Sequence, residues 1–168
     1  MPEERPNPAQ IYRSLAPGVL GYLRAQRVPE PEDVLGEVFL QVARDLPRFR
    51  GNDAALRRWV FSIAHNRAMD AHRRNSRDRS RAAGDQLTRL AQGDGARQAA
   101  APAEPVDPAL VEALSALSAE QREVIVLRFV ADLPAEAVAR ITGRKVGAVK
   151  ALQHRALDNL RKLVAMPD

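Results

Sequence analysis

The sequence predicts an all-α protein made of two small helical domains joined by a flexible linker. Apolar residues recur at helical spacing in both halves, and no alternating, strand-like pattern occurs. The middle of the chain, from about Asn75 to Val106, is rich in Ala, Arg and Gly and has few large apolar residues beyond Leu87 and Leu90. It buries too little surface to offset its ordering entropy. We therefore expect domains at 1–75 and 107–168, with a linker at 76–106 that contains at most a short helix near 86–92.

In the N-terminal half, three helices are expected. The first has an apolar face interrupted at Pro17-Gly18, and its apolar residues are Ile11, Leu15, Val19, Leu20 and Leu23. The second begins near Pro31, with Glu32 and Asp33 in its first turn, where negative charge suits the helix dipole. It ends at Pro47. Its apolar residues are Val34, Leu35, Val38, Phe39, Val42 and Leu46.

The third helix follows a loop at 48–53. Its apolar stripe consists of Leu56, Trp59, Val60, Ile63 and Ala64. Because Trp59 lies on this stripe, we interpret it as a core residue whose ring N–H needs a partner. Phe61 lies off the stripe and is expected to pack against the first helix.

The C-terminal half is also predicted to be helical. Asp107-Pro108 opens one helix, and the capping-box spacing of Ser118 and Gln121 opens the next. A short helix after Leu133-Pro134, a turn at 142–145 and a longer helix then follow. The apolar stripe of the last helix consists of Val146, Val149, Leu152, Ala156, Leu160 and Leu163.

A short helix, a glycine turn and a longer helix make a helix-turn-helix motif, whose second helix enters the DNA major groove. If the apolar stripe of the last helix is buried, its opposite side presents a basic face. The turn lies at a helix N-terminus, which favours phosphate. The candidate DNA-binding residues are Arg144, Lys145, Lys150, Ala151, His154 and Arg155. A helical hairpin with solvated basic residues is the alternative interpretation.

Composition excludes several classes of function. The chain has 168 residues, with 26 Lys and Arg against 21 Asp and Glu, a net charge of +5 that favours an anionic partner, nucleic acid first. It has no cysteine, which excludes disulfides, thiolate zinc sites and thiol catalysis. No stretch approaches the roughly 20 apolar residues of a membrane span. The first residues do not resemble a secretion signal, so no membrane insertion and a cytoplasmic location are expected.

Two parts of the chain resemble one family. The segments 32–40, 46–51 and 59–67, with Asp70 and Arg73-Arg74, resemble the second conserved region of bacterial sigma-70 factors. The segments 117–124, 146–150 and 154–156 resemble the fourth region of that family. The closest type is the small extracytoplasmic-function (group IV) class, which retains only these two regions. The order of the two regions, with a linker between them, is typical of that class.

The resemblance implies an alternative sigma factor that binds core RNA polymerase, through its β′ and β subunits, and directs initiation at promoters with −10 and −35 elements. The second helix would dock on a coiled coil of β′, with Asp33, Glu37, Gln41 and Asp45 as polar contacts; a solvated face is the alternative. The −10 element would be melted and held by the following loop and helix. The candidates there are Phe49, Asn52, Asp53, Arg58, Asn66, Arg67, Arg73 and Arg74.

The resemblance also implies an anti-sigma partner and the −35 element as the target of the helix-turn-helix. No catalytic residue, metal site or cofactor is expected. His65, Asp70 and His72 are spread over two helical turns among arginines, which disfavours a cation, and too few ligands are present for zinc.

Two other functions compete with this hypothesis. One is a dimeric helix-turn-helix regulator that binds a palindromic duplex without polymerase. The other is a protein that binds polymerase but not the promoter. The sequence leaves open whether the two domains are compact or splayed. We expect a compact arrangement to hide both DNA-binding surfaces and to make promoter binding by the isolated protein weak.

Overall fold

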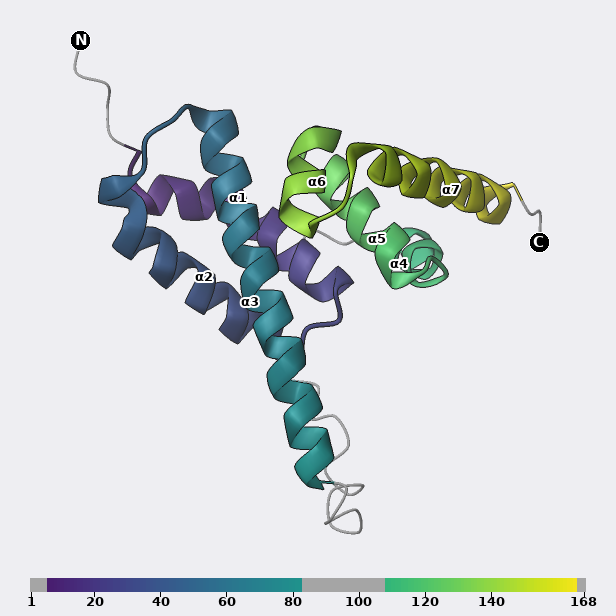
Figure 1. Cartoon of the computed structure of the whole chain (residues 1–168), viewed down its shortest axis with the longest axis horizontal. Coiled ribbons are helices and arrows are strands. Elements are labelled where there is room, and N and C mark those ends of the chain that lie inside the picture. Colours follow the sequence, from purple (N-terminus) through teal and green to yellow (C-terminus); the bar gives the residue numbers. More distant parts are fainter. Residues whose placement is uncertain (1–5, 83–107, 166–168) are drawn as a thin grey trace.

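The computed structural model describes residues 6–82 and 108–165, and every regular element in these ranges is a helix (Figure 1). The first range contains α1 (Pro8–Ala25), α2 (Pro31–Asp45), a short 3-10 turn η1 (Leu46–Arg48) and α3 (Asp53–Ala82). The second contains α4 (Pro108–Ser115), α5 (Ala119–Ile125), a π-helical turn η2 (Val126–Val130), α6 (Ala135–Thr142) and α7 (Val146–Val164). The predicted all-α class is confirmed, whereas the predicted linker helix near 86–92 lies outside the described residues.

The N-terminal domain is a bundle in which α1 and α2 pack against each other and against α3. Its core is formed by the apolar stripes that the sequence predicts, and Val19, Leu23, Val38 and Val60 are fully buried. Phe61 is buried and contacts Tyr22 of α1 edge to face, with ring centroids 6.2 Å apart. The expectation that Phe61 packs against the first helix is therefore confirmed.

Two predicted boundaries in this domain are wrong. Helix α1 runs without a break through Pro17, whose side chain is exposed while its neighbours Ala16 and Val19 are buried. Proline removes one backbone hydrogen bond, and the burial of the residues on either side of Pro17 keeps the helix together. Helix α3 continues through Ala82, so the first seven residues of the predicted linker are helical.

The C-terminal domain begins with α4, which has no buried residue: Leu110 is exposed, and the predicted apolar stripe reaches the interior at Leu117. Ser118 and Gln121 form the predicted capping box at the start of α5. After η2, helices α6 and α7 are joined by a turn in which Gly143 has φ of +70°. Only glycine adopts this left-handed conformation without cost, so Gly143 allows the sharp change of direction between α6 and α7.

The two domains pack against each other. Helix α1 contacts η2 and α5, and α3 contacts α6 (Figure 1). One continuous cluster of buried side chains includes Val19 and Phe61 from the N-terminal domain and Val124, Leu127 and Val138 from the C-terminal domain. The model therefore answers the question that the sequence leaves open, because the described domains form a compact arrangement.

Candidate nucleic-acid interface

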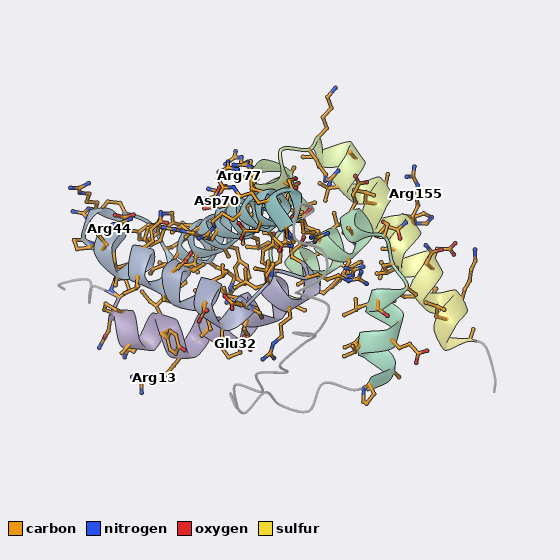
Figure 2. All side chains as sticks on the ribbon, turned by 90° about the horizontal axis from the view of Figure 1, so that it is seen from below. Arg13, Glu32, Arg44, Asp70, Arg77 and Arg155 are labelled. Atoms are coloured by element: carbon orange, nitrogen blue, oxygen red, sulfur yellow. The ribbon has the colours of Figure 1, made fainter. Side chains whose placement is uncertain are left out.

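Helix α7 presents the basic face that the helix-turn-helix pattern predicts. Val149 and Ala156 are fully buried, and this burial turns the opposite side of the helix outward. On that side Lys150, His154 and Arg155 are exposed and Ala151 is half-buried. Figure 2 shows Arg155 on α7 and Arg44 near the opposite end of the molecule. The expectation that a compact arrangement hides this surface is wrong, because α7 extends away from the N-terminal domain (Figure 1).

The turn before α7 holds Arg144 differently from its neighbour. Lys145 is exposed, whereas Arg144 is half-buried, with its Nη1 atom 3.9 Å from Glu120 Oε1 and its Nη2 atom 3.9 Å from Glu123 Oε2. The Nε atom of Arg144 is buried without a hydrogen-bond partner among the described residues. Arg144 therefore faces α5 in this arrangement, and Lys145 is the more accessible of the two cations.

The loop between η1 and α3 is built around an aromatic pair. Phe49 stacks on Trp59, with ring centroids 5.0 Å apart and planes inclined by 23°. Gly51 has φ of +149°, and a Cβ atom there would lie 2.8 Å from Ala55 Cβ and 3.1 Å from the Phe49 ring. A side chain at position 51 would therefore disturb the stack. Trp59 is half-buried against the core, as its position on the stripe predicts.

The start of α3 is fixed by Asn52. Its side-chain oxygen accepts a hydrogen bond of 2.9 Å from the backbone N–H of Ala55. This contact satisfies one of the donors that a helix N-terminus leaves unpaired. Asn52 therefore has a structural role in addition to its predicted contact with DNA, while Asp53 beside it is exposed.

The arginines predicted to hold the −10 phosphates differ in their surroundings. Arg67 donates to Gln41 Oε1 from Nε at 3.2 Å and from Nη2 at 2.9 Å, so it bridges α3 to α2. Arg74 lies 3.5 Å from Glu37, and Arg73 is bonded to Asp70 at 3.2 Å. The remaining candidates on α3, Arg58 and Asn66, are exposed.

The four polar residues predicted to contact polymerase are likewise divided. Gln41 and Glu37 are half-buried and face the arginines of α3, with Arg67 Nη1 3.7 Å from Glu37 Oε2. Asp33 is exposed in the first turn of α2, and Asp45 at its end is bonded to Arg44 at 3.4 Å. Helix α2 therefore exposes Asp33, holds the half-buried Asp45 beside Arg44, and is attached to α3 through its two central polar residues.

A polar cluster that the sequence analysis missed lies between the domains. The hydroxyl of Tyr22 donates to Glu123 Oε1 at 3.0 Å, and His65 Nδ1 lies 2.9 Å from that hydroxyl and 3.0 Å from the same carboxylate oxygen. A proton on Nδ1 lets the histidine donate while the tyrosine hydroxyl donates to Glu123. Burial is the main cause that raises the pKa of Tyr22, followed by the charge of Glu123.

Next to this cluster, Arg122 is also buried. Its guanidinium donates to the carbonyls of Leu114 and Leu117 at 3.0 Å each and to that of Ala25, in α1, at 3.1 Å. Burial, with Arg27 as a lesser cause, lowers the pKa of Arg122. A signal existed in the sequence: Arg122 and Glu123 precede the unbroken apolar run 124–127, and a helix that is apolar all round is buried.

The facing surfaces of α3 and α6 line an open cavity of about 300 Å³. It is lined by Ala55, Arg58, Trp59, Ser62, Ala137, Arg140 and Ile141. Nearby, Arg57 lies 3.7 Å from Asp132 across the domain boundary. The start of α3, predicted to meet the −10 element, therefore faces the C-terminal domain.

Two features are absent from the described parts of the chain. In residues 6–82 and 108–165, no three His, Asp or Glu side chains gather closely enough to hold a metal ion. Within the same ranges, no helix has the length and apolar character needed to cross a bilayer.

Comparison with known proteins identifies the family. Residues 11–78 match the model of sigma-70 region 2, and residues 113–162 match the model of sigma-70 region 4. The chain is 36% identical over 167 residues to the extracytoplasmic-function RNA polymerase sigma factor SigD of Mycobacterium tuberculosis, covering 95% of this chain and 78% of SigD. It is 31% identical over 161 residues to the RNA polymerase sigma factor CarQ of Myxococcus xanthus, covering 92% and 87%.

Solved structures share the fold. The sigma factor RpoE of Bartonella quintana, in complex with the anti-sigma factor NepR, matches with a TM-score of 0.65 at 24% identity, covering 95% of this chain and 98% of that one. CnrH, in complex with the cytosolic domain of CnrY, matches with a TM-score of 0.59 at 23% identity, covering 94% and 86%. With both conserved regions in order and this relationship to SigD, the chain belongs to the extracytoplasmic-function class of the sigma-70 family of RNA polymerase sigma factors.

Proposed function

We propose that this sigma factor binds core RNA polymerase through α2 and places its two domains on the −10 and −35 elements of a promoter. It catalyses no covalent step itself. The observation that carries the proposal is the exposed basic face of α7 at the end of a helix-turn-helix, in a chain that also has the region 2 bundle. A helix-turn-helix regulator alone does not account for that bundle.

At the −35 element, α7 would enter the major groove. Lys150, His154 and Arg155 are exposed along one side of the helix and lie within reach of base edges and phosphates. Lys145, at the turn, would hold a phosphate beside the helix N-terminus. Arg144 would join them once it separates from Glu120 and Glu123.

At the −10 element, the loop before α3 would hold separated bases. Melting breaks stacking worth about 1.4 kcal/mol per step, and holding a flipped base costs a few kcal/mol more. The Phe49–Trp59 stack is an aromatic surface beside the exposed Asp53, and Arg58 and Asn66 continue along α3. Because Arg67 is bonded to Gln41, we assign it first to the attachment of α3 to α2 and second to DNA.

On the polymerase side, the exposed Asp33 would be the accessible acidic contact of α2 for the β′ coiled coil, and the half-buried Asp45 would join it once it separates from Arg44. Glu37 and Gln41 would act by holding α2 against α3, through Arg67 and Arg74. An anti-sigma protein is a further proposed partner, because the matching structure of the sigma factor RpoE is a complex with the anti-sigma factor NepR. The proposed location is the cytoplasm, where polymerase and promoter DNA are found.

The −35 assignment can be tested with a matched pair of lysines on α7. Lys150→Ala should remove one phosphate or base contact, and Lys162→Ala, which replaces an exposed lysine paired with Asp158 at 3.3 Å, should not. With polymerase holoenzyme on a genomic fragment that it transcribes, the slope of log affinity against log salt should fall by about 1 for Lys150→Ala. An unchanged slope for Lys150→Ala, together with Lys145→Ala and Arg155→Ala, would contradict contact between α7 and DNA.

A further inference from the structure

The boundary between the two domains is crossed by charged groups that none of the proposed contacts with DNA or polymerase uses. Helix α5 places two consecutive charged residues, Arg122 and Glu123, in the interior, 6% and 7% exposed. Both reach the N-terminal domain: Arg122 through the carbonyl of Ala25, and Glu123 through Tyr22 and His65. Tyr22, in α1, is fully buried.

Buried charges of this kind specify an arrangement more than they stabilise it. Moving a carboxylate and a guanidinium out of water is costly, and their hydrogen bonds offset the cost only when every partner is in place. Here Glu123 Oε1 finds its partners on α1 and α3, whereas Oε2 faces Arg144 of its own domain at 3.9 Å, so Oε1 is satisfied when the domains are docked. When the domains separate, water can solvate the same groups, so separation carries a smaller penalty than it would for a wholly apolar interface.

The contacts around the polar groups are compatible with reversible docking. A Cβ atom added at Gly21 of α1 would lie 3.9 Å from the Val130 side chain, and one added at Gly18 would lie 3.9 Å from the Val130 carbonyl, so η2 approaches a part of α1 that lacks side chains. Val130 itself is 54% exposed, and the Arg57–Asp132 pair lies at the surface. Among the described residues, the buried hydrogen bond across the boundary is the one from Tyr22 to Glu123, and the bond from Arg122 to Ala25 is part-buried.

We propose that four residues, Tyr22, His65, Arg122 and Glu123, form a latch. Their contacts across the boundary hold the two domains together in the free protein, and these contacts break when the domains separate. The latch residues are positioning residues, since none of them needs to touch DNA. Its role in transcription rests on the proposed function, because −10 and −35 elements lie about 25 base pairs, or about 85 Å, apart at 3.4 Å per pair. Even α3, at about 45 Å for 30 residues, is too short to bridge that span.

The test measures domain separation directly. Since the chain has no cysteine, Ala54→Cys and Glu136→Cys introduce two spin-label sites on exposed positions beside the cavity between α3 and α6. The distance between the labels is measured by pulsed electron paramagnetic resonance over a urea series, with helix content followed by circular dichroism. In the wild-type background, short distances should give way to long ones before helix content is lost.

The variant Tyr22→Phe removes one hydroxyl and leaves the ring contact with Phe61. The lost hydrogen bond joins a hydroxyl to a charged carboxylate. Its loss should raise the ratio of separated to closed molecules by at least about tenfold. Tyr12→Phe is the matched control, because Tyr12 is an exposed residue of the same helix whose ring contacts Phe39. Its separation curve should coincide with that of the wild type. A second variant, Glu123→Leu, leaves the Tyr22 hydroxyl and His65 Nδ1 buried without their acceptor when the domains are docked, so it should also favour separation.

Curves for Tyr22→Phe and Glu123→Leu that coincide with the wild-type curve would overturn the latch, as would separation that occurs only together with loss of helix. The readout requires neither polymerase nor DNA. If the latch variants separate as expected but core polymerase fails to bind any of the proteins, the proposed function fails and the latch stands. If polymerase binds but the latch variants behave as wild type, the reverse holds.

Discussion

At the scale of single residues, Tyr22 is a buried residue of the N-terminal domain whose hydroxyl bonds to the C-terminal domain. Its hydroxyl is buried next to Glu123 Oε1 and His65 Nδ1, and the second oxygen of Glu123 faces Arg144 at 3.9 Å. Ionising this tyrosine inside the interface would place a second negative charge beside Glu123. This is the physical reason why burial and Glu123 raise the pKa of Tyr22 above its ordinary value of 10.0.

Because the pKa of Tyr22 is raised in the folded protein, the free energy of unfolding should fall at high pH. A group that holds its proton more tightly in the folded state contributes stability in full below its unfolded pKa and loses it as the pH rises through the folded value. Above about pH 10, the free energy of unfolding should therefore fall more steeply for the wild type than for Tyr22→Phe. Urea unfolding between pH 9 and 11 checks this, with Tyr12→Phe expected to follow the wild type. Parallel profiles for wild type and Tyr22→Phe would show that Tyr22 ionises as it does in water.

Single residues also mark the limit of sequence analysis. The basic face of α7 was predictable, because the apolar stripe fixes which side is buried. The two hydrogen bonds from Arg67 to Gln41 were not predicted, since they join two helices. The apolar run 124–127 was a signal for the burial of Arg122 and Glu123, but their partners on α1 and α3 could not be read from it. Spacing along one helix indicates which side faces inward, and it does not say which polar groups meet there.

At the scale of elements, the helices were predictable from their stripes and caps, and the errors lie where local and tertiary effects disagree. The capping box at Ser118 is local and was predicted. The continuity of α1 through Pro17 depends on packing, and the seven extra residues of α3 lie in a segment of low apolar content. Two turns have a glycine at positive φ, Gly51 before α3 and Gly143 before α7, whereas Arg27, Glu30 and Asp132 adopt positive φ in the turns before α2 and α6.

Two glycines provide a matched test of this account of the turns. Gly143→Ala puts a side chain at φ of +70° and should destabilise the protein by about 1–2 kcal/mol. Gly36→Ala lies in α2, where an added Cβ meets nothing within 4 Å, and should stabilise it by about 0.5–1 kcal/mol. Thermal unfolding of the two variants beside the wild type measures both effects. A Gly143→Ala protein as stable as the wild type would mean that the turn relaxes without strain.

At the scale of the whole molecule, the structure shows how the two domains pack together, which the sequence left open. The described domains share one buried cluster, with the start of α3 facing α6 and the basic face of α7 turned outward. No pattern within one domain records how it docks on another, because the contacts join residues about 100 positions apart, such as Tyr22 and Glu123.

The closed arrangement predicts weak promoter binding by the isolated protein. With the domains packed together, α7 and α3 cannot reach two elements about 85 Å apart at the same time. Binding to a promoter fragment should therefore be weak without core polymerase and should strengthen when polymerase is added, which fluorescence anisotropy at fixed salt would show. Low-salt protection of both elements at nanomolar protein alone would contradict the closed state in solution.

The central claim is that this chain directs initiation at promoters with two elements. It is tested most directly by transcription of genomic DNA fragments with purified core polymerase and this protein, followed by sequencing of the transcript 5′ ends. The account predicts new start sites that share two spaced upstream elements and that are lost when the protein is omitted. Stable binding to polymerase with no new start sites would contradict it, and would favour a protein that binds polymerase without recognising promoters.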